Sequence, residues 1–400
     1  MTCCAGSALA RLAGVAALLL ALSSTAFAQD APRPAAGATS GERYKNIQVL
    51  KDLPGDQLHD AMTYMAATVG GNCQTCHVRG ADGEFAYEKD DNDRKMTART
   101  MIQMVRSINT QHFKGEDRVA CATCHQGRRE PSPLTPLAQP LTPDQLAALA
   151  ERAAGRQGGA PAAAGQAGAG RGAAAAPAGR GAQRPAETVD EVLDKYVAAL
   201  GGRDAIARLT SRVRRGTLTN RTGQTSPLTI EETAAGRIRV TLASTPGSAR
   251  ATDGTSAWTE SGGRVRTLDG VETANTGLQA DMLLGVDIKE KYAALAVRAY
   301  ERANGKAVVV VEGRRSAAAA ETLYFDRASG LLVRRSVRLN TPMGQLPVQI
   351  DYDGYRPVDG VLTPFEVRVT DWESVSVETF SDITHNQPID AARFARPAAK

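Results

Sequence analysis

Apolar and polar residues follow three different patterns along residues 41–400 of the 400-residue chain, and each pattern predicts a different structure. Residues 41–135 carry apolar positions at helical spacing, so we expect a mainly α domain there. Residues 187–400 begin with a helical pattern and continue in runs of alternating apolar and polar residues, which predicts an antiparallel β domain. Residues 136–186 contain one short helical pattern near Thr142, followed by a stretch rich in Ala, Gly and Pro. This stretch lacks the large apolar side chains of a packed core, so we expect a disordered linker between two domains.

Two helices are predicted in the first domain from the spacing of their apolar residues. The first lies in GDQLHDAMTYMAATVG and the second in DRKMTARTMIQMVRSIN. Each contains a pair of methionines three positions apart, on one helix face. The first face comprises Leu58, Met62, Met65 and Val69, and the second comprises Thr97, Met101, Met104, Val105 and Ile108.

The second domain is predicted to open with a helix and to continue as a meander of strands. Thr188 and Glu191 have the spacing of a capping box, and Gly201-Gly202 ends the helical pattern. A second short helix is expected at 203–209. The alternating runs are RIRVTL, AVVVVEG, ETLYFD, LLVRRSVRL, LPVQIDY, FEVRVTDW and VSVETF. The turn signals between runs are Asp253-Gly254, Asp326 to Gly330, and Asp359-Gly360.

Residues 1–28 have the pattern of a secretory signal peptide. A positive charge at Arg11 is followed by an apolar run, and the segment ends in Ala26-Phe27-Ala28. The run is short for a membrane span. We therefore expect a periplasmic protein, cleaved before Gln29, with peripheral membrane association left open. The net charge is +5, and the basic residues are interspersed with acidic ones instead of being clustered on one element. The charge therefore gives no indication of nucleic-acid binding.

The cysteines indicate the chemistry of the first domain. Cys3 and Cys4 belong to the expected signal peptide, and the four others occur in GGNCQTCHVRG and ACATCHQG. Each sequence contains the motif C-x-x-C-H, in which two thiols attach a haem through thioether bonds and the histidine binds its iron. Two covalently bound haem c groups are predicted, on Cys73 and Cys76 with His77 and on Cys121 and Cys124 with His125. A zinc site built from two C-x-x-C pairs is the alternative, although it needs no histidine after each pair.

The methionine pairs are candidates for the sixth ligand of each iron, because both lie on helices that precede an attachment site. Methionines at such spacing also serve as core residues, which is the alternative interpretation. His59 and His112 are competing ligands. Ligation by histidine and methionine closes both axial positions and favours electron transfer over chemistry at the iron.

Residues 43–131 resemble a known family. The sequence YKNIQVLKDLP, the two M-x-x-M pairs, TARTMIQMVRSIN and VACATCHQG are similar to the cytochrome c subunit of photosynthetic reaction centres, and more so to its shorter diheme relatives. The resemblance implies that the first methionine of each pair is the axial ligand, Met62 for the first haem and Met101 for the second. Met65 and Met104 are the alternatives, because the spacers to the cysteines are short. The photosynthetic subunit binds four haems, whereas this chain has motifs for two.

The second domain resembles lipoprotein-sorting carrier domains, in which an incomplete antiparallel barrel wraps over short helices. This resemblance rests on the opening helix, the meander and hairpins such as LYFDRASGLLVRR. It implies an apolar cavity for acyl chains or a lipoprotein. Met282, Leu283 and Leu284 are candidates for its lining, with plain core residues as the alternative. Trp258 and Trp372 are interpreted as structural, and no partner for His385 is evident.

The leading functional hypothesis is a periplasmic diheme cytochrome that relays electrons between redox proteins, with a tethered β domain that binds a lipid or a partner. No catalytic residues are predicted. The alternatives are a peroxidase-like diheme enzyme, which needs an open sixth position on one iron, and a haem-based redox sensor whose main activity is ligand binding in the β domain. Arg128 and Arg129 follow the second motif and are candidates for pairing with haem propionates or an acidic partner. Maturation requires the haem attachment machinery.

Overall fold

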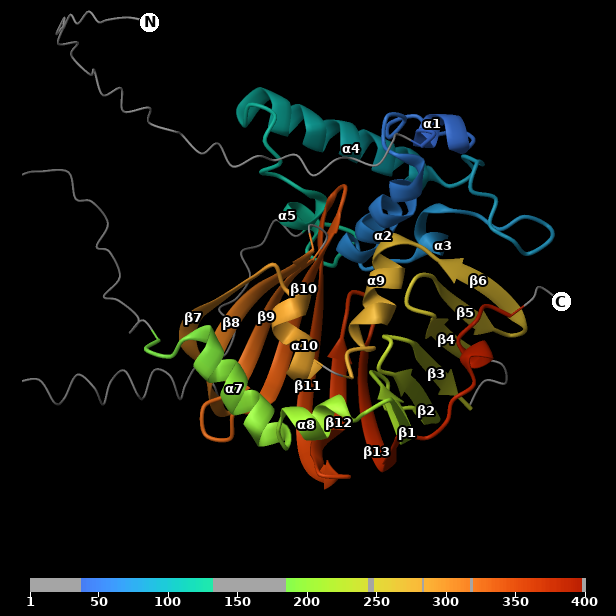
Figure 1. The fold of residues 1–400 in the computed structure, drawn as a ribbon. Helices are drawn as coiled ribbons and strands as arrows, with labels where there is room; N and C mark the ends of the chain where they lie inside the picture. The colour runs from blue at the N-terminus through green and yellow to red at the C-terminus, as the bar shows by residue number, and fades with distance from the viewer. Residues whose placement is uncertain (1–36, 132–184, 244–247, 283, 317–318, 398–400) are drawn as a thin grey trace, which may run out of the picture. The chain divides into compact units, whose positions relative to one another are not determined.

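The structure is a computed structural model that describes residues 37–131, 185–243, 248–282, 284–316 and 319–397 (Figure 1). The expected signal peptide, the helix near Thr142 and nearly all of the expected linker lie outside these residues. Within the described ranges, no helix combines the length and the apolar character that crossing a bilayer requires.

Residues 37–131 are built from short helices around one longer helix. The two helices predicted from the methionine spacing are confirmed as α2 and α4. The side chain of Asn92 begins α4 by accepting a hydrogen bond from the backbone N–H of Arg94. The elements are α1 (Ser40–Arg43), η1 (Gly55–Gln57), α2 (Leu58–Thr68), α3 (Cys73–Cys76), α4 (Asp93–His112) and α5 (Cys121–His125).

A small apolar cluster joins α2 to α4. Leu58 and Ala61 of α2 and Ile102 of α4 are buried in it, and Met62 and Met65 pack against it. The predicted apolar face of α2 therefore does face a core. On α4 the result differs from the expected pattern, because Ile102 and Asn109 are its buried residues while the methionine pair is exposed.

The helices of the second part include those predicted from the sequence. The capping box of α7 is formed as expected: Glu191 N donates to Thr188 Oγ1 over 3.2 Å, and Thr188 N donates to Glu191 Oε2 over 2.7 Å. Gly201 ends this helix at a φ of 117°, a value that favours glycine. The helices are α7 (Val189–Leu200), α8 (Arg203–Ala207), α9 (Gly270–Leu278), α10 (Leu284–Lys291) and the 3-10 turn η2 (Ala391–Arg393).

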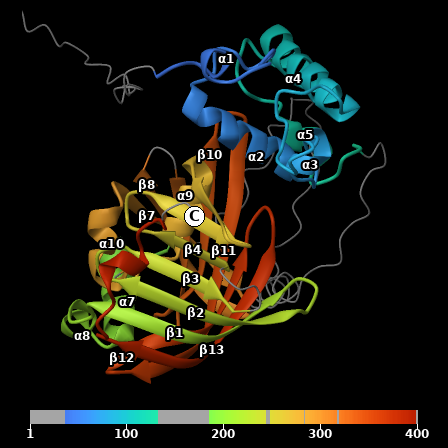
Figure 2. The same cartoon turned by 90° about the vertical axis from the view of Figure 1, so that its right-hand side faces the viewer.

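The strands form one sheet of 13 strands in which every neighbouring pair is antiparallel (Figure 2). The strand order is β6-β5-β4-β3-β2-β1-β13-β12-β11-β10-β9-β8-β7. Two meanders thus meet where β1 pairs with β13. The strands are β1 (Ser211–Asn220), β2 (Thr225–Thr233), β3 (Ile238–Leu242), β4 (Ser248–Thr252), β5 (Ala257–Ser261), β6 (Arg264–Leu268), β7 (Ala294–Ala303), β8 (Lys306–Ser316), β9 (Ala319–Asp326), β10 (Leu332–Thr341), β11 (Gly344–Val358), β12 (Val361–Thr370) and β13 (Val375–His385).

The predicted antiparallel β domain with short helices is confirmed. All seven alternating runs fall on strands, β3 and β8 to β13, and the three turn signals lie between β4 and β5, β9 and β10, and β11 and β12. Strands such as β4 (SARAT) and β6 (RVRTL) were not singled out, because small and charged residues obscure their alternation.

The helices cover one face of this sheet, and two of them connect its edges. The chain leaves the edge strand β6, forms α9 and α10, and enters the other edge strand β7. A cluster of buried apolar residues from α7, α8 and α10 packs against β8, β9, β10 and β12. A second cluster lies between α9 and strands β2, β3 and β10 to β13. The space enclosed between helices and sheet contains the cavity described below.

Candidate functional site

Each C-x-x-C-H motif folds as a single helical turn. In α3 and in α5 the two cysteines are three residues apart, which places both sulfur atoms on one side of the turn. All four cysteines are free thiols; Cys73 and Cys124 are exposed, and Cys76 and Cys121 are partly exposed. Burial raises the pKa of the Cys76 thiol. This geometry fits two thioether bonds to one porphyrin at each turn.

A threonine between the cysteines caps each turn in the same way. The backbone N–H of Asn72 donates to Oγ1 of Thr75 over 3.0 Å, and the N–H of Ala120 donates to Oγ1 of Thr123 over 3.0 Å. In both turns the hydroxyl satisfies a backbone donor that has no partner within the helix. The two attachment sites are therefore local structural repeats that include the third residue of each motif.

Helix α4 is hydrogen-bonded at its start to the first attachment turn and near its end to the residue just before the second. At its start, Asn92 Nδ2 donates to the carbonyl oxygen of Thr75 over 3.2 Å. Near its end, Asn109 Nδ2 donates to the carbonyl oxygen of Val119 over 2.8 Å, and Asn109 Oδ1 accepts from the N–H of Val119 over 2.9 Å. Neither asparagine was predicted as a site residue, because polar residues on a helix are usually solvated.

The end of α2 also contacts the second attachment site. The N–H of Gly127 donates to the carbonyl oxygen of Thr68 over 2.9 Å. Gly70 has a φ of 62°, and a Cβ placed there would lie 2.2 Å from the carbonyl oxygen of Gly127. This approach of the two backbones requires glycine. Since α3 begins shortly after Gly70, both C-x-x-C-H turns lie near the carboxyl end of α2.

The two histidines of the motifs differ in their surroundings. His125 Nδ1 lies 3.0 Å from the carbonyl oxygen of Arg128, to which it donates when protonated there. That hydrogen bond leaves Nε2 for a metal. His77 contacts the edge of the Tyr87 ring at 5.0 Å between centroids, and its Nδ1 is buried without a partner in the described residues. Burial, together with the nearby Lys95, lowers the pKa of His77.

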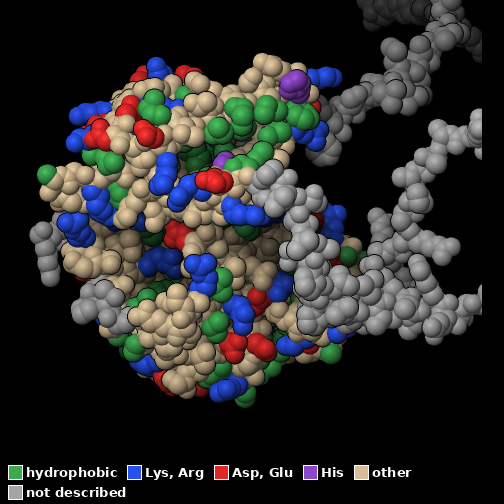
Figure 3. Space-filling view, turned by 180° about the vertical axis from the view of Figure 1, so that it is seen from behind, with side chains coloured by type: hydrophobic (Ala, Val, Ile, Leu, Met, Phe, Trp, Pro, Cys, Tyr) green, Lys and Arg blue, Asp and Glu red, His purple; other side chains and the backbone are tan. Residues whose placement is uncertain are grey.

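The candidate axial ligands lie on the predicted helices, in different environments. Met62 and Met65 pack against the apolar cluster between α2 and α4. Met101 and Met104 are 36% and 42% exposed, and Figure 3 shows hydrophobic side chains gathered on the surface in the region of α4. The competing ligand His112 is exposed at the end of α4, and His59 is partly exposed in α2. In the described part of the chain, no three His, Cys, Asp or Glu side chains are gathered as a metal site.

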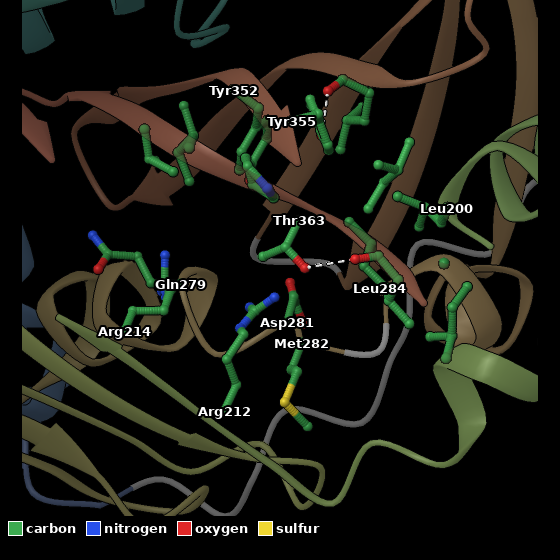
Figure 4. A pocket seen from close by; sticks show the side chains of 18 of the residues that line it. Leu200, Arg212, Arg214, Gln279, Asp281, Met282, Leu284, Tyr352, Tyr355 and Thr363 are labelled. Carbon is green, nitrogen blue, oxygen red and sulfur yellow. Dashed lines mark hydrogen bonds between the residues drawn. The ribbon is translucent and has the colours of Figure 1, made fainter. Parts of the chain in front are cut away.

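A cavity of about 90 Å³ lies between the helices and the sheet of the β domain (Figure 4). Part of its wall is apolar and comes from the helices, including Leu200, Ile206 and Leu284. Met282 and Leu284, two of the predicted lining residues, line it and are also buried in the adjacent core cluster. The third, Leu283, lies outside the described residues.

Charged side chains also line the cavity. Arg212 and Arg214 of β1 line the cavity and share one carboxylate, that of Glu232 on β2. Glu378 of β13 also lines it and is 3% exposed. Burial works against ionisation of Glu232, but the two arginines offset this and its pKa is lowered. Burial raises the pKa of Glu378, and the more distant Arg214 and Arg250 offset this only in part.

A second set of charges attaches the connection between α9 and α10 to the sheet. Arg335 of β10 is fully buried and lies 2.7 Å from Asp281 Oδ2 and 2.6 Å from Glu321 Oε2. Arg315 and Lys291 contact the other oxygen of Asp281 at 2.7 and 3.1 Å. Burial raises the pKa of Asp281, but these cations outweigh it and hold the pKa well below its usual range. Sequence reasoning missed this network, since its members are far apart along the chain.

The remaining residues singled out in the β domain have structural surroundings. Trp258 is 1% exposed, and its Nε1 donates to the carbonyl oxygen of Phe394 over 2.9 Å, as expected for a structural residue. Trp372 packs against the second core cluster. His385 is 4% exposed, with Asp359 at 3.5 Å.

Comparison with known proteins supports the resemblance of the amino-terminal part. A model of the family described as "Photosynthetic reaction centre cytochrome C subunit" matches residues 9–155. The photosynthetic reaction center cytochrome c subunit of Roseobacter denitrificans is 38% identical over 96 residues, which cover 22% of this chain and 25% of that protein. The subunit of Thermochromatium tepidum is 34% identical over 105 residues, covering 24% and 25%. The chain thus matches about a quarter of the length of these relatives.

Solved structures resemble the remainder of the chain. A DUF1329 family protein from Desulfovibrio piger has a TM-score of 0.38 at 13% identity and covers 53% of this chain and 99% of its own. A LolA superfamily protein from Nitrosomonas europaea has a TM-score of 0.37 at 14% identity and covers 53% and 99%. A lipoprotein-sorting protein domain from Vibrio parahaemolyticus has a TM-score of 0.37 at 13% identity and covers 50% and 97%.

Proposed function

We propose that the chain is an exported c-type cytochrome with two haems that relays electrons between redox partners, and that its β domain holds an apolar ligand or partner. The observation that carries the proposal is that the two C-x-x-C-H turns are held by the same two helices, α2 and α4. Both are capped by a threonine, and the second contacts the end of α2 beside the first. Asn92 at the start of α4 bonds to the first turn, and Asn109 near its end bonds to Val119, just before the second turn. Two haem attachment turns held by the same helices suit a protein that relays electrons.

The chain's own residues have distinct roles in this proposal. Cys73 and Cys76 attach one haem and Cys121 and Cys124 the other, while His77 and His125 are the proximal ligands. Haem, when bound in this way, supplies reversible one-electron chemistry at iron. The carbonyl oxygen of Arg128 orients the ring of His125 through its 3.0 Å contact with Nδ1.

Whether a methionine would be the sixth ligand of each iron distinguishes an electron carrier from an enzyme. We assign Met62 and Met101 as ligands, with Met65 and Met104 as the alternatives. A sulfur ligand on each iron leaves no open position, which favours electron transfer over a peroxidase-like activity. The exposed Arg128 and Arg129, next to the second motif, are suited to contact propionates or an acidic redox partner.

The test is a count of covalent haem in the matured full-length protein. Pyridine haemochrome spectra and the intact mass are expected to give two haems per chain. The double variant Cys73→Ala/Cys76→Ala should retain one, and Cys121→Ala/Cys124→Ala should retain the other. An unmodified polypeptide mass, or bound zinc in place of haem, would refute the proposal. An iron that reacts with peroxide would instead favour the peroxidase-like alternative.

A further inference from the structure

The segments that follow the two C-x-x-C-H motifs differ in conformation, and this difference affects the two proximal histidines. After His125 the chain turns at Gln126 and Gly127, whose φ values are 49° and 78°. The turn brings the backbone of Arg128 back to the histidine, and Arg128 N donates to the carbonyl oxygen of His125 over 2.9 Å. The carbonyl oxygen of Arg128 lies 3.0 Å from Nδ1 of His125. The second motif is therefore followed at once by a hydrogen-bond acceptor for its histidine.

Contacts with the end of α2 fix this turn. Gly127 N donates over 2.9 Å to the carbonyl oxygen of Thr68, the last residue of α2. The backbone of Gly70 approaches the carbonyl oxygen of Gly127 so closely that a side chain at position 70 would clash with it. The acceptor for His125 is a backbone atom of this fixed turn, so it does not depend on the exposed side chain of Arg128.

A different loop follows His77. Its backbone groups bond within the loop and to α4: Ala86 N donates to the carbonyl oxygen of Val78 over 3.0 Å. The ammonium of Lys95 donates to the carbonyl oxygen of Tyr87 over 2.8 Å. The loop places the ring of Tyr87 against that of His77, edge to face, with 5.0 Å between the centroids. Nδ1 of His77 is buried there and has no hydrogen-bond partner among the described residues.

The hydrogen bond at Nδ1 changes how strongly an imidazole donates to iron through Nε2. Donation from Nδ1–H to a carbonyl oxygen makes the ring a more basic ligand, which stabilises the ferric iron more than the ferrous iron. A buried N–H without an acceptor has the opposite effect, because the ring becomes more positive when the iron is ferric and its N–H is then more costly to leave unpaired. Since the proposed sixth ligand is methionine at both irons, the two haems differ on the histidine side.

We propose that the backbone carbonyl of Arg128 is a positioning group that gives the second haem, bound by His125, a lower reduction potential than the first haem, bound by His77. This inference rests on the proposed function and adds the order of the two haems in the relay. One electron supplied by a redox partner reduces the iron bound by His77, while the iron bound by His125 stays ferric. The first attachment site is then the one from which an accepting partner takes the electron.

The inference is tested by spectroelectrochemical titration of the matured full-length protein, which should show two one-electron transitions. The reduction equilibria of the two haems should differ by roughly tenfold or more, which is about 59 mV between the midpoints. The variant Cys73→Ala/Cys76→Ala retains the second haem and should show the lower midpoint. The variant Cys121→Ala/Cys124→Ala retains the first haem and should show the higher one. Equal midpoints, or the reverse order, would overturn the inference.

A substitution in the turn tests the hydrogen bond while both haems are present. Valine is strongly disfavoured at positive φ, so Gly127→Val should displace the turn and with it the carbonyl oxygen of Arg128. The lower midpoint should then rise toward the higher one. The matched control is Gly83→Val, in the loop after the first motif. At both glycines φ is 78° and an added Cβ meets no atom within 4 Å. The control should leave the lower midpoint unchanged.

The Nδ1–H proton resonances of the fully reduced, diamagnetic protein report the hydrogen bond itself. The resonance of His125 should lie downfield of that of His77, and it should move upfield in Gly127→Val. A lower midpoint that stays in place although this resonance has moved would overturn the inference. Two haems per chain with equal or reversed midpoints refute this inference alone, whereas a haem count below two refutes the proposed function.

Discussion

The side chain of Asn109 forms two hydrogen bonds with the backbone of Val119, donating to its carbonyl oxygen over 2.8 Å and accepting from its N–H over 2.9 Å. Asn109 lies near the end of α4 and is 5% exposed. Val119 lies just before the second C-x-x-C-H turn. The amide therefore closes the loop between helix and turn, and it determines where Cys121 lies relative to α4.

Replacing Asn109 should destabilise the attachment region. Asn109→Ala leaves both backbone groups of Val119 without partners, and we expect the free energy of unfolding to fall by about 1–3 kcal/mol. Chemical denaturation followed by the haem absorption measures it. Thr110→Ala, at the exposed neighbouring position, is the control and should have little effect. Equal stabilities of the two variants would contradict the role assigned to Asn109.

The hydroxyl groups of Thr75 and Thr123, and not their methyl groups, should stabilise the two attachment turns. Thr75→Val and Thr123→Val leave the N–H of Asn72 or Ala120 without its acceptor, and each should cost about 1 kcal/mol of unfolding free energy. Thr75→Ser and Thr123→Ser keep the hydroxyl and should be close to wild type. The same denaturation experiment distinguishes the pairs. If the serine variants are as unstable as the valine variants, packing of the methyl group is responsible instead.

Gly70 should tolerate a side chain much less well than Gly83, although both have positive φ values, of 62° and 78°. Gly83→Ala meets no atom within 4 Å and should cost only the strain of the left-handed backbone, about 1–2 kcal/mol. Gly70→Ala adds a clash with the carbonyl oxygen of Gly127. Its unfolding free energy should therefore fall further. A comparable loss in both variants would show that the contact between Gly70 and Gly127 is dispensable.

The axial assignment makes a spectroscopic prediction. Met101→Ala should remove one methionine–iron charge-transfer band at the red end of the visible spectrum and lower the reduction potential of one haem, since a weaker or different ligand then occupies the sixth position. Met104→Ala is the matched control, three residues away on the same exposed face of α4. It should keep the band. The reverse result would assign Met104 as the ligand.

Glu378 should make the stability of the β domain depend on pH. Its pKa is raised in the folded state by burial, so the protonated form is favoured there. This stabilisation is fully present below the pKa of an unfolded glutamate, about 4.3, and is lost as the pH rises through the higher folded value. Glu378→Gln should therefore be more stable than wild type at neutral pH, and this advantage should shrink toward pH 4. Thermal unfolding at both pH values measures it. Glu366→Gln, at an exposed position on β12, is the control; an advantage independent of pH would contradict the prediction.

Local patterns along the sequence were sufficient to predict four of the helices, α2, α4, α7 and α8, and seven of the 13 strands. The methionine spacing located α2 and α4, the Thr188–Glu191 box and Gly201 located both ends of α7, and alternation located β3 and β8 to β13. These signals depend on neighbours within a few residues, which the sequence shows directly. The C-x-x-C-H motifs are equally local, and they gave the haem prediction from spacing alone.

Contacts between distant positions were decided only by the tertiary structure. Nothing in the sequence indicates that Asn109 would bond to Val119, or that Arg214 would reach the cavity with one carboxylate shared between two arginines. A polar residue on a helix or a strand is compatible with either solvent or burial, and its partner depends on how the elements pack. The sequence by itself therefore determined the elements with strong local patterns and the C-x-x-C-H motifs on which the haem prediction rests. The pairing of β1 with β13 and the packing of helices on the sheet determined which charges became buried, because burial and pairing arise only when segments far apart in the chain meet.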